Sequence, residues 1–316
     1  MKFWFSLILV MITFQMAGCT NQKKTALKIG ISTWPGYEPL VLALENKYYD
    51  NVDVRIVRFS TPTESYRALR DGAIDVAAFT ADEVLYYARL KKNPKIFHVL
   101  DISNGADALV VRPDIEKLDD LKGTKVGIEN STLDNYMVRC ALDFSESTTV
   151  NDLTLVPLEI NEHAEAYASG KVDALVTYEP AKTHALNFGA HVIFSSKQIP
   201  YEVADILVAD EKTLETKEAA LKEIVAGWYK AIEYIQLNKE KAYSRMAQNE
   251  GISDAEFESA FASLIIPTRS EVKGMLNHGD KSLIPVLNRM VEIMNSKDIF
   301  DKKIDVESIL TSDIVD

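Results

Sequence analysis

Short apolar runs alternate along most of this chain with segments that carry apolar residues at three- and four-residue spacing. The short runs predict buried strands, and the spaced segments predict amphipathic helices. The first strand is expected over 27–32, and it runs directly into a turn over 33–37 that Pro35 and Gly36 mark. Strands that alternate with short helices favour parallel sheets with right-handed crossovers, and hence an α/β fold.

The strand and helix pattern occurs twice. The segment around Gly30 matches the segment around Gly127 at an offset of 97 residues. Two further matches, 69–77 with 167–175 and 106–110 with 204–208, both have an offset of 98. Three matches at nearly one spacing indicate two similar lobes. Gly72 and Gly170 follow predicted helices at the position where a left-handed residue ends a helix.

Each lobe is expected to contain further strands and helices after its first strand. Helices are predicted over 39–49, 63–70, 134–144 and 162–169, and strands over 52–59, 74–79, 153–158 and 172–177. The apolar spacing beyond residue 210 predicts a helical tail packed on the first lobe, with helices over 218–237, from 253 onward and over 281–295.

The third repeated match lies at the boundaries between the lobes. We therefore expect strands near 106–110 and 204–208 to cross from one lobe to the other. The first lobe would comprise 27–105 plus 210–316, and the second lobe 106–209. Two crossings form a hinge, and two lobes on a hinge enclose a cleft that can close.

Composition and charge narrow the class of protein. The chain has 316 residues, of which 47% are hydrophobic, so about two domains with a sizeable core are expected. The formal net charge is −12, and no cluster of lysine and arginine stands out, which argues against a nucleic-acid partner. The cysteines are Cys19 and Cys140; Cys140 lies in an apolar helical pattern and is interpreted as a core residue.

The first residues have the pattern of an export signal. A positive start is followed by an apolar stretch over 3–14, which is short for a membrane span. Residues 16–19 then resemble the lipobox of bacterial lipoproteins, which implies removal of a signal peptide over 1–18 and lipidation of Cys19. Residues 19–26 would form a short polar tether. The alternative is an ordinary secretory signal with a chance cysteine.

Several longer stretches resemble one known family, the substrate-binding proteins of bacterial ABC importers for nitrate, sulfonates, taurine and thiamine-pyrimidine precursors. The resemblance rests on the lipobox and on LKIGISTWPGYEPLVLA, LRDGAIDVAAFTADEVL, ADALVVRPDIEKLDDLKGTKVGIE and GKVDALVTYEP. It implies a two-lobed periplasmic-binding-protein fold of type II and a monomer anchored in the cell envelope through lipid. It also implies delivery of a small molecule to an ABC permease and ATPase, with no cofactor and no metal.

In that family the ligand lies between the lobes and contacts the loops at the strand ends. The corresponding positions after the strands of the first lobe are Trp34, Gly36, Tyr37, Glu38, Ser60, Thr61, Thr80, Ala81 and Asp82. Those of the second lobe are Asn130, Ser131, Thr132, Tyr178 and Glu179. Asp107 and Asp205 lie on the predicted crossing strands. Trp34 and Tyr37 could instead be core aromatics, and Asp82 and Asp205 could be helix caps or hydrogen-bond acceptors of the hinge.

Two features of these positions bear on the ligand. Backbone N–H groups at predicted helix starts near Thr80 and Ser131 favour an anionic or oxygen-rich group. Against this, five acids gather at the predicted mouth, and no lysine or arginine occupies the predicted loops beside them: Glu38, Asp82, Asp107, Glu179 and Asp205. Carboxylates beside aromatic rings suit a protonated amine, a guanidinium or an aminopyrimidine. We therefore expect a nitrogen-containing metabolite of aminosulfonate, amine or aminopyrimidine type.

Two other classes of function remain open from the sequence. None of the five histidines has a metal-ligand spacing or adjoins a nucleophile motif, so the sequence predicts no enzyme. Pyrimidine-synthase-like enzymes are known on the same fold, but the cysteine-rich stretch associated with them is absent here. A ligand-sensing partner of a membrane signalling receptor would have the same sequence features as an importer component.

Overall fold

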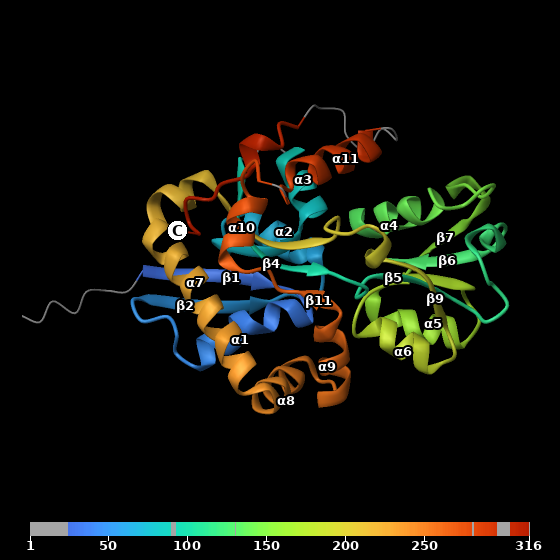
Figure 1. Ribbon diagram of the computed structural model, residues 1–316, viewed down its shortest axis with the longest axis horizontal. Coiled ribbons are helices and arrows are strands. Elements are labelled where there is room, and N and C mark those ends of the chain that lie inside the picture. The colour runs from blue at the N-terminus through green and yellow to red at the C-terminus, as the bar shows by residue number, and fades with distance from the viewer. Residues whose placement is uncertain (1–24, 90–92, 130, 280, 296–303, 316) are drawn as a thin grey trace, which may run out of the picture.

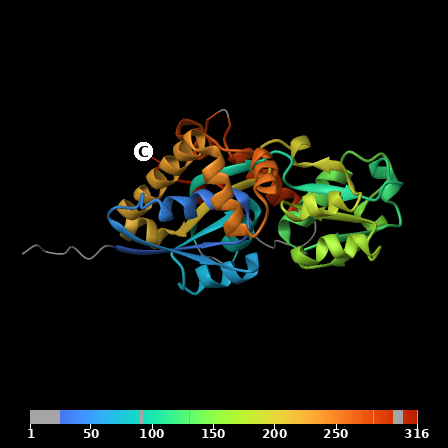
Figure 2. The same ribbon diagram turned by 90° about the horizontal axis from the view of Figure 1, so that it is seen from below.

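The protein consists of two α/β lobes that lie side by side (Figure 1). The structure is a computed structural model, and it describes residues 25–89, 93–129, 131–279, 281–295 and 304–315. The expected signal peptide, Cys19 and most of the expected tether lie outside the described residues. Seen from below in Figure 2, the two lobes again lie next to each other along the long axis of the molecule.

The first lobe is built on a six-stranded sheet with the order β11-β4-β10-β3-β1-β2. Its strands are β1 (Thr25–Ile31), β2 (Val52–Arg58), β3 (Val76–Thr80), β4 (Pro94–Ser103), β10 (Ala204–Asp210) and β11 (Leu264–Ile265). The strands β1, β2 and β3 are parallel, and β10 runs antiparallel between β3 and β4. Because β1 has a partner strand on each side, Leu27, Ile29 and Ile31 are fully buried, whereas Lys28 between them is exposed.

The second lobe is built on a five-stranded sheet with the order β7-β6-β8-β5-β9. Its strands are β5 (Ala108–Val111), β6 (Lys125–Ile128), β7 (Thr154–Pro157), β8 (Ala174–Thr177) and β9 (His191–Ser195). The parallel set β7-β6-β8 repeats β2-β1-β3 of the first lobe, as the internal duplication predicts. Gly72 and Gly170 both have a φ of +71°, which confirms the predicted left-handed positions after the second helix of each lobe.

The helices cover both sheets. The α-helices are α1 (Glu38–Glu45), α2 (Pro62–Arg70), α3 (Ala81–Arg89), α4 (Thr132–Leu142), α5 (His163–Ala168), α6 (Ala181–Asn187), α7 (Glu211–Leu237), α8 (Lys239–Glu250), α9 (Asp254–Ala262), α10 (Arg269–Met275) and α11 (Ile284–Asn295). Short 3₁₀ helices are η1 (Pro35–Tyr37), η2 (Leu118–Leu121), η3 (Val150–Asp152), η4 (Ile160–Glu162), η5 (Ser196–Gln198) and η6 (Glu307–Ile309). The helix α7 begins seven residues earlier than expected, because Asp210 caps it by accepting a hydrogen bond from Thr213 N.

The chain crosses between the lobes just before β5 and just before β10. β4 belongs to the first sheet and β5 to the second, so the first crossing lies between residues 103 and 108. β10 pairs with β3 and β4 over its length, so it belongs wholly to the first lobe. The sequence placed a crossing strand at 204–208 and assigned it to the second lobe. The structure instead places the crossing between β9 and β10, because an apolar strand with a partner on each side is part of a sheet core.

The helix α11 connects the two lobes on one side of the molecule, although the tail was expected to pack on the first lobe only. It contacts α3 of the first lobe and α4 of the second (Figure 1). Arg289 Nη1 lies 2.7 Å from Glu202 Oε1 on the second crossing segment, and Arg289 Nη2 lies 3.6 Å from Asp143 Oδ2 beside α4. The fully buried Leu287 belongs to an apolar cluster that includes residues of both lobes.

Cys140 is buried in α4, as expected for a core residue. Trp228 is fully buried in α7 and also serves packing. No helix in the described ranges is long and apolar enough to cross a membrane.

The contact between α11 and the lobes gives a prediction for stability. Replacing the fully buried Leu287 with alanine removes apolar packing that joins the lobes, and we expect a loss of about 2–5 kcal/mol in the free energy of unfolding. Leu237→Ala is the matched control, because this side chain is 75% exposed, and it should change the value by about 0.5 kcal/mol at most. Urea denaturation measures both; equal effects would contradict the role of α11.

Candidate functional site

A cavity of about 50 Å³ lies where the carboxyl ends of the parallel strands of the two lobes meet. In sheets of this kind ligands bind outside the carboxyl ends of the strands, where the loops converge. The lining comes from both lobes and from the first crossing: Ser32, Thr33, Trp34, Tyr37, Thr80, Glu83, Asp107, Glu129, Ser131, Leu133, Asp134, Tyr178 and Asp205.

Aromatic rings from the two lobes meet at this cavity. The indole of Trp34 and the phenol ring of Tyr178 are edge to face, with centroids 5.9 Å apart and an interplanar angle of 71°. Trp34 comes from the loop between β1 and η1, and Tyr178 from the loop between β8 and α6. The lobes are therefore in contact through the walls of the cavity, which is the arrangement of a closed cleft.

Carboxylates hold the aromatic side chains of the first lobe in place. Trp34 Nε1 donates a hydrogen bond of 3.2 Å to Asp101 Oδ2, and the hydroxyl of Tyr37 donates one to Asp205 Oδ1. Asp101 is fully buried in β4, and Asp205 faces it from the neighbouring strand β10. These bonds orient both rings toward the cavity, so Asp101 positions the wall of the cavity without lining it.

Gly36 makes room for the Asp101 carboxylate. A Cβ atom built on Gly36 would lie 1.9 Å from Asp101 Oδ2 and 2.6 Å from Trp34 Nε1. No side chain fits at these distances. Gly36 therefore contributes to the site through the absence of a side chain, and not through its backbone conformation.

Burial strongly perturbs the acids around the cavity. Desolvation is the largest cause, and it raises the pKa of Asp101, Glu83 and Asp134 to about 8 each, and that of Asp107 to about 6. It also raises the pKa of Glu129, and raises that of Asp205 well above its usual range, where the nearby Asp101 adds to the shift. These acids therefore hold their protons to a higher pH than exposed carboxyl groups do, and a cation placed among them would favour their ionised form.

Little positive charge opposes these acids. None of the described lining residues is a lysine, arginine or histidine. The ammonium group of Lys182 lies close by, but it pairs with Glu179 Oε1 at 2.7 Å and donates to the backbone oxygen of Gly105 at 2.6 Å. The electrostatic character of the cavity is thus set by acids, whose burial favours a positively charged or proton-donating guest.

The structure brings seven of the residues expected from sequence together around the cavity. They are Trp34, Tyr37, Thr80, Asp107, Ser131, Tyr178 and Asp205. They come from strand ends far apart in the chain, and the family resemblance, applied to the strand ends of the duplicated pattern, was the signal that pointed to them.

Two expected acids lie outside the cavity because each has a basic partner. Glu38 is fully buried in the first turn of α1, where it accepts from Arg58 Nη2 at 2.6 Å and from Asn249 Nδ2 at 3.0 Å. Glu179 pairs with Lys182. The predicted loops beside these acids hold no lysine or arginine, as expected, but Arg58 from β2 and Lys182 from α6 reach the two acids.

The remaining expected residues do not line the cavity. Ser60 donates its N–H to Glu64, and the hydroxyl of Thr61 caps α2 by accepting from Glu64 N. Ala81, Asp82 and Thr132 lie in the first turns of α3 and α4, with Ala81 and Asp82 buried behind the cavity. Asn130 lies outside the described residues.

The sequence reading missed several residues of the site. These are Ser32, Thr33, Glu83, Glu129, Leu133 and Asp134 in the lining, and Asp101 behind it. Glu83 and Asp134 stand three residues after Thr80 and Ser131, which is the spacing of a helix capping box and was visible in the sequence. Asp101 had no local signal, because its partners Trp34 and Asp205 are distant in the chain.

The acids do not form a metal site in the part of the chain that the structure describes, since no group of three or more His, Cys, Asp or Glu side chains there could hold a metal ion. The cavity is also free of cysteine and histidine among its described lining residues.

The two sheets, the double crossing and the interlobe cavity define the class as a two-lobed periplasmic-binding-protein fold of type II. The model of the NMT1-like family matches residues 20–249 of this chain. The match covers more than half of the chain, so the chain belongs to the NMT1-like family. A search of curated protein sequences found no match.

Solved structures with the same fold include binding proteins and an enzyme. The periplasmic aliphatic sulphonate binding protein SsuA from Escherichia coli has a TM-score of 0.76 at 20% identity, covering 92% of this chain and 99% of that chain. The alkanesulfonate-binding protein SsuA from Xanthomonas axonopodis pv. citri, bound to MOPS, has 0.73 at 16%, covering 92% and 97%. The desulfurization enzyme DSZB has 0.68 at 15%, covering 92% and 97%. At these identities the likeness establishes the fold alone.

The packing around Gly36 gives a prediction for the site. Gly36→Ala should displace Asp101 and Trp34, reduce the free energy of unfolding by about 1–3 kcal/mol and change the fluorescence of Trp34. Gly274→Ala is the matched control, because a Cβ there meets nothing within 4 Å, and it should be neutral or stabilising. Unchanged fluorescence and stability for Gly36→Ala would contradict the close approach.

The raised pKa values give a prediction for pH dependence. A carboxyl group with a raised folded pKa holds a proton that the unfolded chain has released, so stability is lost as pH rises toward the folded pKa. For Asp101, Glu83 and Asp134 this loss extends to about pH 8. The buried His98, whose pKa burial lowers to about 3, acts in the opposite direction but only below its usual pKa of 6.5.

We therefore expect the ligand-free protein to lose stability between pH 6.5 and pH 8. Each proton involved contributes up to about 1.4 kcal/mol per pH unit to the slope. Asp101→Asn should reduce the slope, because the amide does not titrate. Chemical denaturation across this range measures it, and a stability that rises with pH would show that these acids are ionised in the empty cavity.

Proposed function

We propose that this protein is an extracytoplasmic solute-binding protein that captures a small cationic or N–H-rich nitrogen compound between its lobes. The single observation that supports this most is the surplus of buried acids over basic groups around the interlobe cavity. A buried carboxylate without a partner is costly, and a bound cation or hydrogen-bond donor offsets that cost.

The ligand class follows from the lining. A protonated amine, an amidine or an aminopyrimidine can donate to carboxylates on both lobes while its apolar or flat face contacts Trp34 and Tyr178. Sulfonates are named for the two SsuA proteins of the same fold. A simple sulfonate would find acids and no basic side chain among the described lining of this cavity, so we do not extend that ligand to this chain. Of the expected ligands, an aminosulfonate fits the charge of the cavity less well than an amine or an aminopyrimidine.

Capture occurs by closure. The walls of the cavity come from both lobes, so a ligand that bridges them favours the closed state by its difference in affinity between closed and open forms. The two crossing segments, 104–107 and 196–203, are the connections about which the lobes move.

Cellular context completes the proposal. Residues 1–18 are the signal peptide, Cys19 carries the lipid anchor, and the closed protein delivers its ligand as a monomer to an ABC permease with its ATPase. A metabolic labelling experiment with a radioactive fatty acid tests the anchor, because Cys19→Ala should abolish incorporation. Genes for a permease and an ATPase beside this one would distinguish transport from delivery to a signalling receptor.

An enzymatic function is the alternative that the shared fold with DSZB raises. A hydrolytic or synthase mechanism needs a positioned nucleophile or acid–base pair beside the substrate. Among the described cysteines and histidines, Cys140 is buried in α4, and His163 is buried beside Thr177 Oγ1 at 3.1 Å. Neither lines the cavity, so binding is the function that we propose.

The proposal is tested by identifying the ligand. Mass spectrometry of the small molecules that co-purify should find a nitrogen compound. Calorimetric titration of the unloaded protein should then give binding for ethylammonium, taurine or hydroxymethylpyrimidine. Tight binding of nitrate or an alkylsulfonate, without binding of any amine or aminopyrimidine, would refute the proposed ligand class.

A matched pair of aromatic truncations tests the position of the site. Trp34→Ala should weaken binding of the identified ligand by more than about tenfold, since stacking on a cation in a desolvated site contributes roughly 1–2 kcal/mol or more. Phe188→Ala is the control, because this ring is 59% exposed on the second lobe and lies outside the cavity; it should leave affinity unchanged. Unchanged affinity in Trp34→Ala would move the site elsewhere.

A further inference from the structure

Two helices that face the cavity carry an acid as their third residue, and its carboxyl group accepts a hydrogen bond from a backbone N–H that precedes the helix. At α3, Glu83 Oε2 accepts a hydrogen bond of 2.9 Å from Thr80 N. At α4, Asp134 Oδ2 accepts one of 2.5 Å from Glu129 N, while the hydroxyl of Ser131 accepts from Asp134 N at 3.0 Å. Glu83 and Asp134 belong to the helices, Thr80 and Ser131 directly precede them, and Glu129 lies in the loop before α4. All five residues line the cavity.

Thr80 N directly precedes α3, where a helix start can bind an anion, whereas Glu129 N lies in the loop two residues before Ser131, which caps α4. Unpaired backbone N–H groups and the helix dipole make the first turn of a helix favourable for a phosphate, a sulfonate or a carboxylate. Here Glu83 occupies Thr80 N, Asp134 occupies Glu129 N, and Ser131 occupies Asp134 N in the first turn of α4. An anionic ligand would have to displace a buried carboxyl group from Thr80 N or Glu129 N, and ionisation of that group would place a negative charge beside the ligand.

A second observation indicates what the cavity accepts instead. Asp107 lies on the first crossing segment, is only 4% exposed and lines the cavity. Its backbone N–H donates to Ser103 Oγ, but its carboxylate oxygen Oδ2 has no partner within the described structure. A buried oxygen without a donor is costly, so this atom requires a donor from the ligand.

We propose that Glu83 and Asp134 are specificity-determining residues: by occupying Thr80 N at the start of α3 and Glu129 N in the loop before α4, they exclude anions and make the cleft selective for cationic ligands. This inference rests on the proposed function and goes beyond it, because it assigns the selectivity to two side chains on opposite lobes. In this proposal each side chain has two roles: its charge attracts a cationic ligand, and its carboxyl group occupies a backbone N–H. Amide variants remove the charge, and alanine variants remove the charge and also free the N–H.

The experiment compares two probes of equal size and opposite charge, ethylammonium and ethanesulfonate, by calorimetry on the full chain without co-purified ligand. The wild-type protein should bind ethylammonium and show no detectable binding of ethanesulfonate. Glu83→Gln with Asp134→Asn removes the charges and should weaken ethylammonium binding at least tenfold. Glu83→Ala with Asp134→Ala also frees the N–H groups and should in addition give measurable binding of ethanesulfonate.

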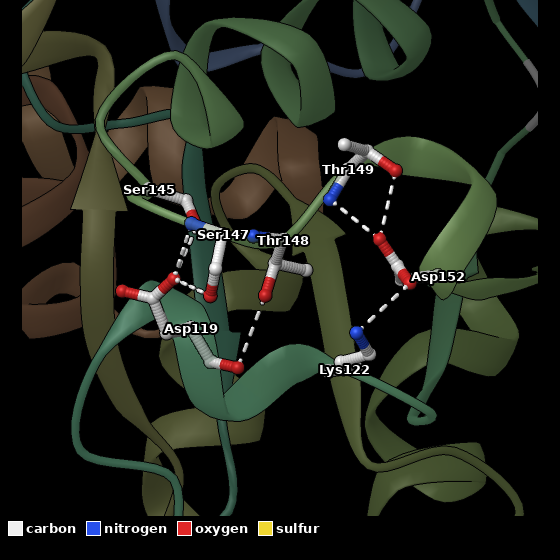
Figure 3. Close-up of polar contacts among 7 residues, drawn as sticks. All are labelled: Asp119, Lys122, Ser145, Ser147, Thr148, Thr149 and Asp152. Atoms are coloured by element: carbon white, nitrogen blue, oxygen red, sulfur yellow. Dashed lines mark hydrogen bonds and ion pairs between the residues drawn. The ribbon is translucent and has the colours of Figure 1, made fainter.

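The chain offers matched controls away from the cavity. Glu271 caps α10 in the same way as Glu83, since its Oε2 accepts from Thr268 N at 2.9 Å. Asp152 caps the short helix η3, where its Oδ2 accepts from Thr149 N at 2.9 Å and its other oxygen lies 3.5 Å from Lys122 Nζ (Figure 3). Glu271→Ala and Asp152→Ala therefore remove comparable caps, and they should leave the preference between the two probes unchanged.

The outcomes separate this inference from the proposed function. In one outcome the wild-type protein binds neither probe, and the double alanine variant binds ethanesulfonate. The proposed ligand class then fails, but the inference that Glu83 and Asp134 exclude anions stands. If the wild-type protein binds ethylammonium and the variants keep the same preference, the proposed function stands and this inference is overturned. Sulfonate binding by the wild-type protein overturns both. Should the double alanine variant not fold, the amide variant and each single substitution give the same comparison.

Discussion

The interlobe cavity is dominated by the burial of carboxyl groups without matching basic side chains. Charges removed from water need a proton, a counter-charge or hydrogen-bond donors, because protein interiors solvate them poorly. In this protein Asp101 and Asp205 are partly satisfied by the indole of Trp34 and the hydroxyl of Tyr37, whereas Asp107 keeps an oxygen without a partner. The proposed ligand supplies the hydrogen-bond donor or positive charge that the Asp107 carboxyl group lacks.

The fold makes this concentration of acids possible. In a parallel sheet all strands deliver their following loops to one edge, so each lobe presents several loops to the other. The duplication places two such edges face to face. After each crossing the chain forms an antiparallel strand, β5 in the second lobe and β10 in the first. As a result Asp205, on β10, reaches the cavity from the first lobe, although the chain has just left the second.

The two lobes are also coupled outside the cavity. The helix α11 lies against α3 and α4, and Arg289 joins it to Glu202 on a crossing segment and to Asp143 beside α4. A second contact between the lobes joins α6 to α9: the imidazole of His184 on α6 lies 3.4 Å from Glu256 on α9 of the first lobe. Any opening of the cleft must rearrange these contacts as well as the pair formed by Trp34 and Tyr178, so closure is a property of the whole molecule and not of the cavity alone.

The sequence by itself determined the α/β class and the duplication, because strand and helix periodicity are local. The seven lining residues were expected from the family resemblance, which places the ligand at the loops after the strands. It also held a local sign of Glu83 and Asp134 in their capping-box spacing. Only the tertiary structure decided which acids face the cavity. In the sequence, Glu38 and Glu179 were acids expected at the cavity just as Asp107 and Asp205 were. In the fold, Arg58 and Asn249 bind Glu38, and Lys182 pairs with Glu179. The partners of a buried charge come from distant parts of the chain, so they become known only when the chain is folded.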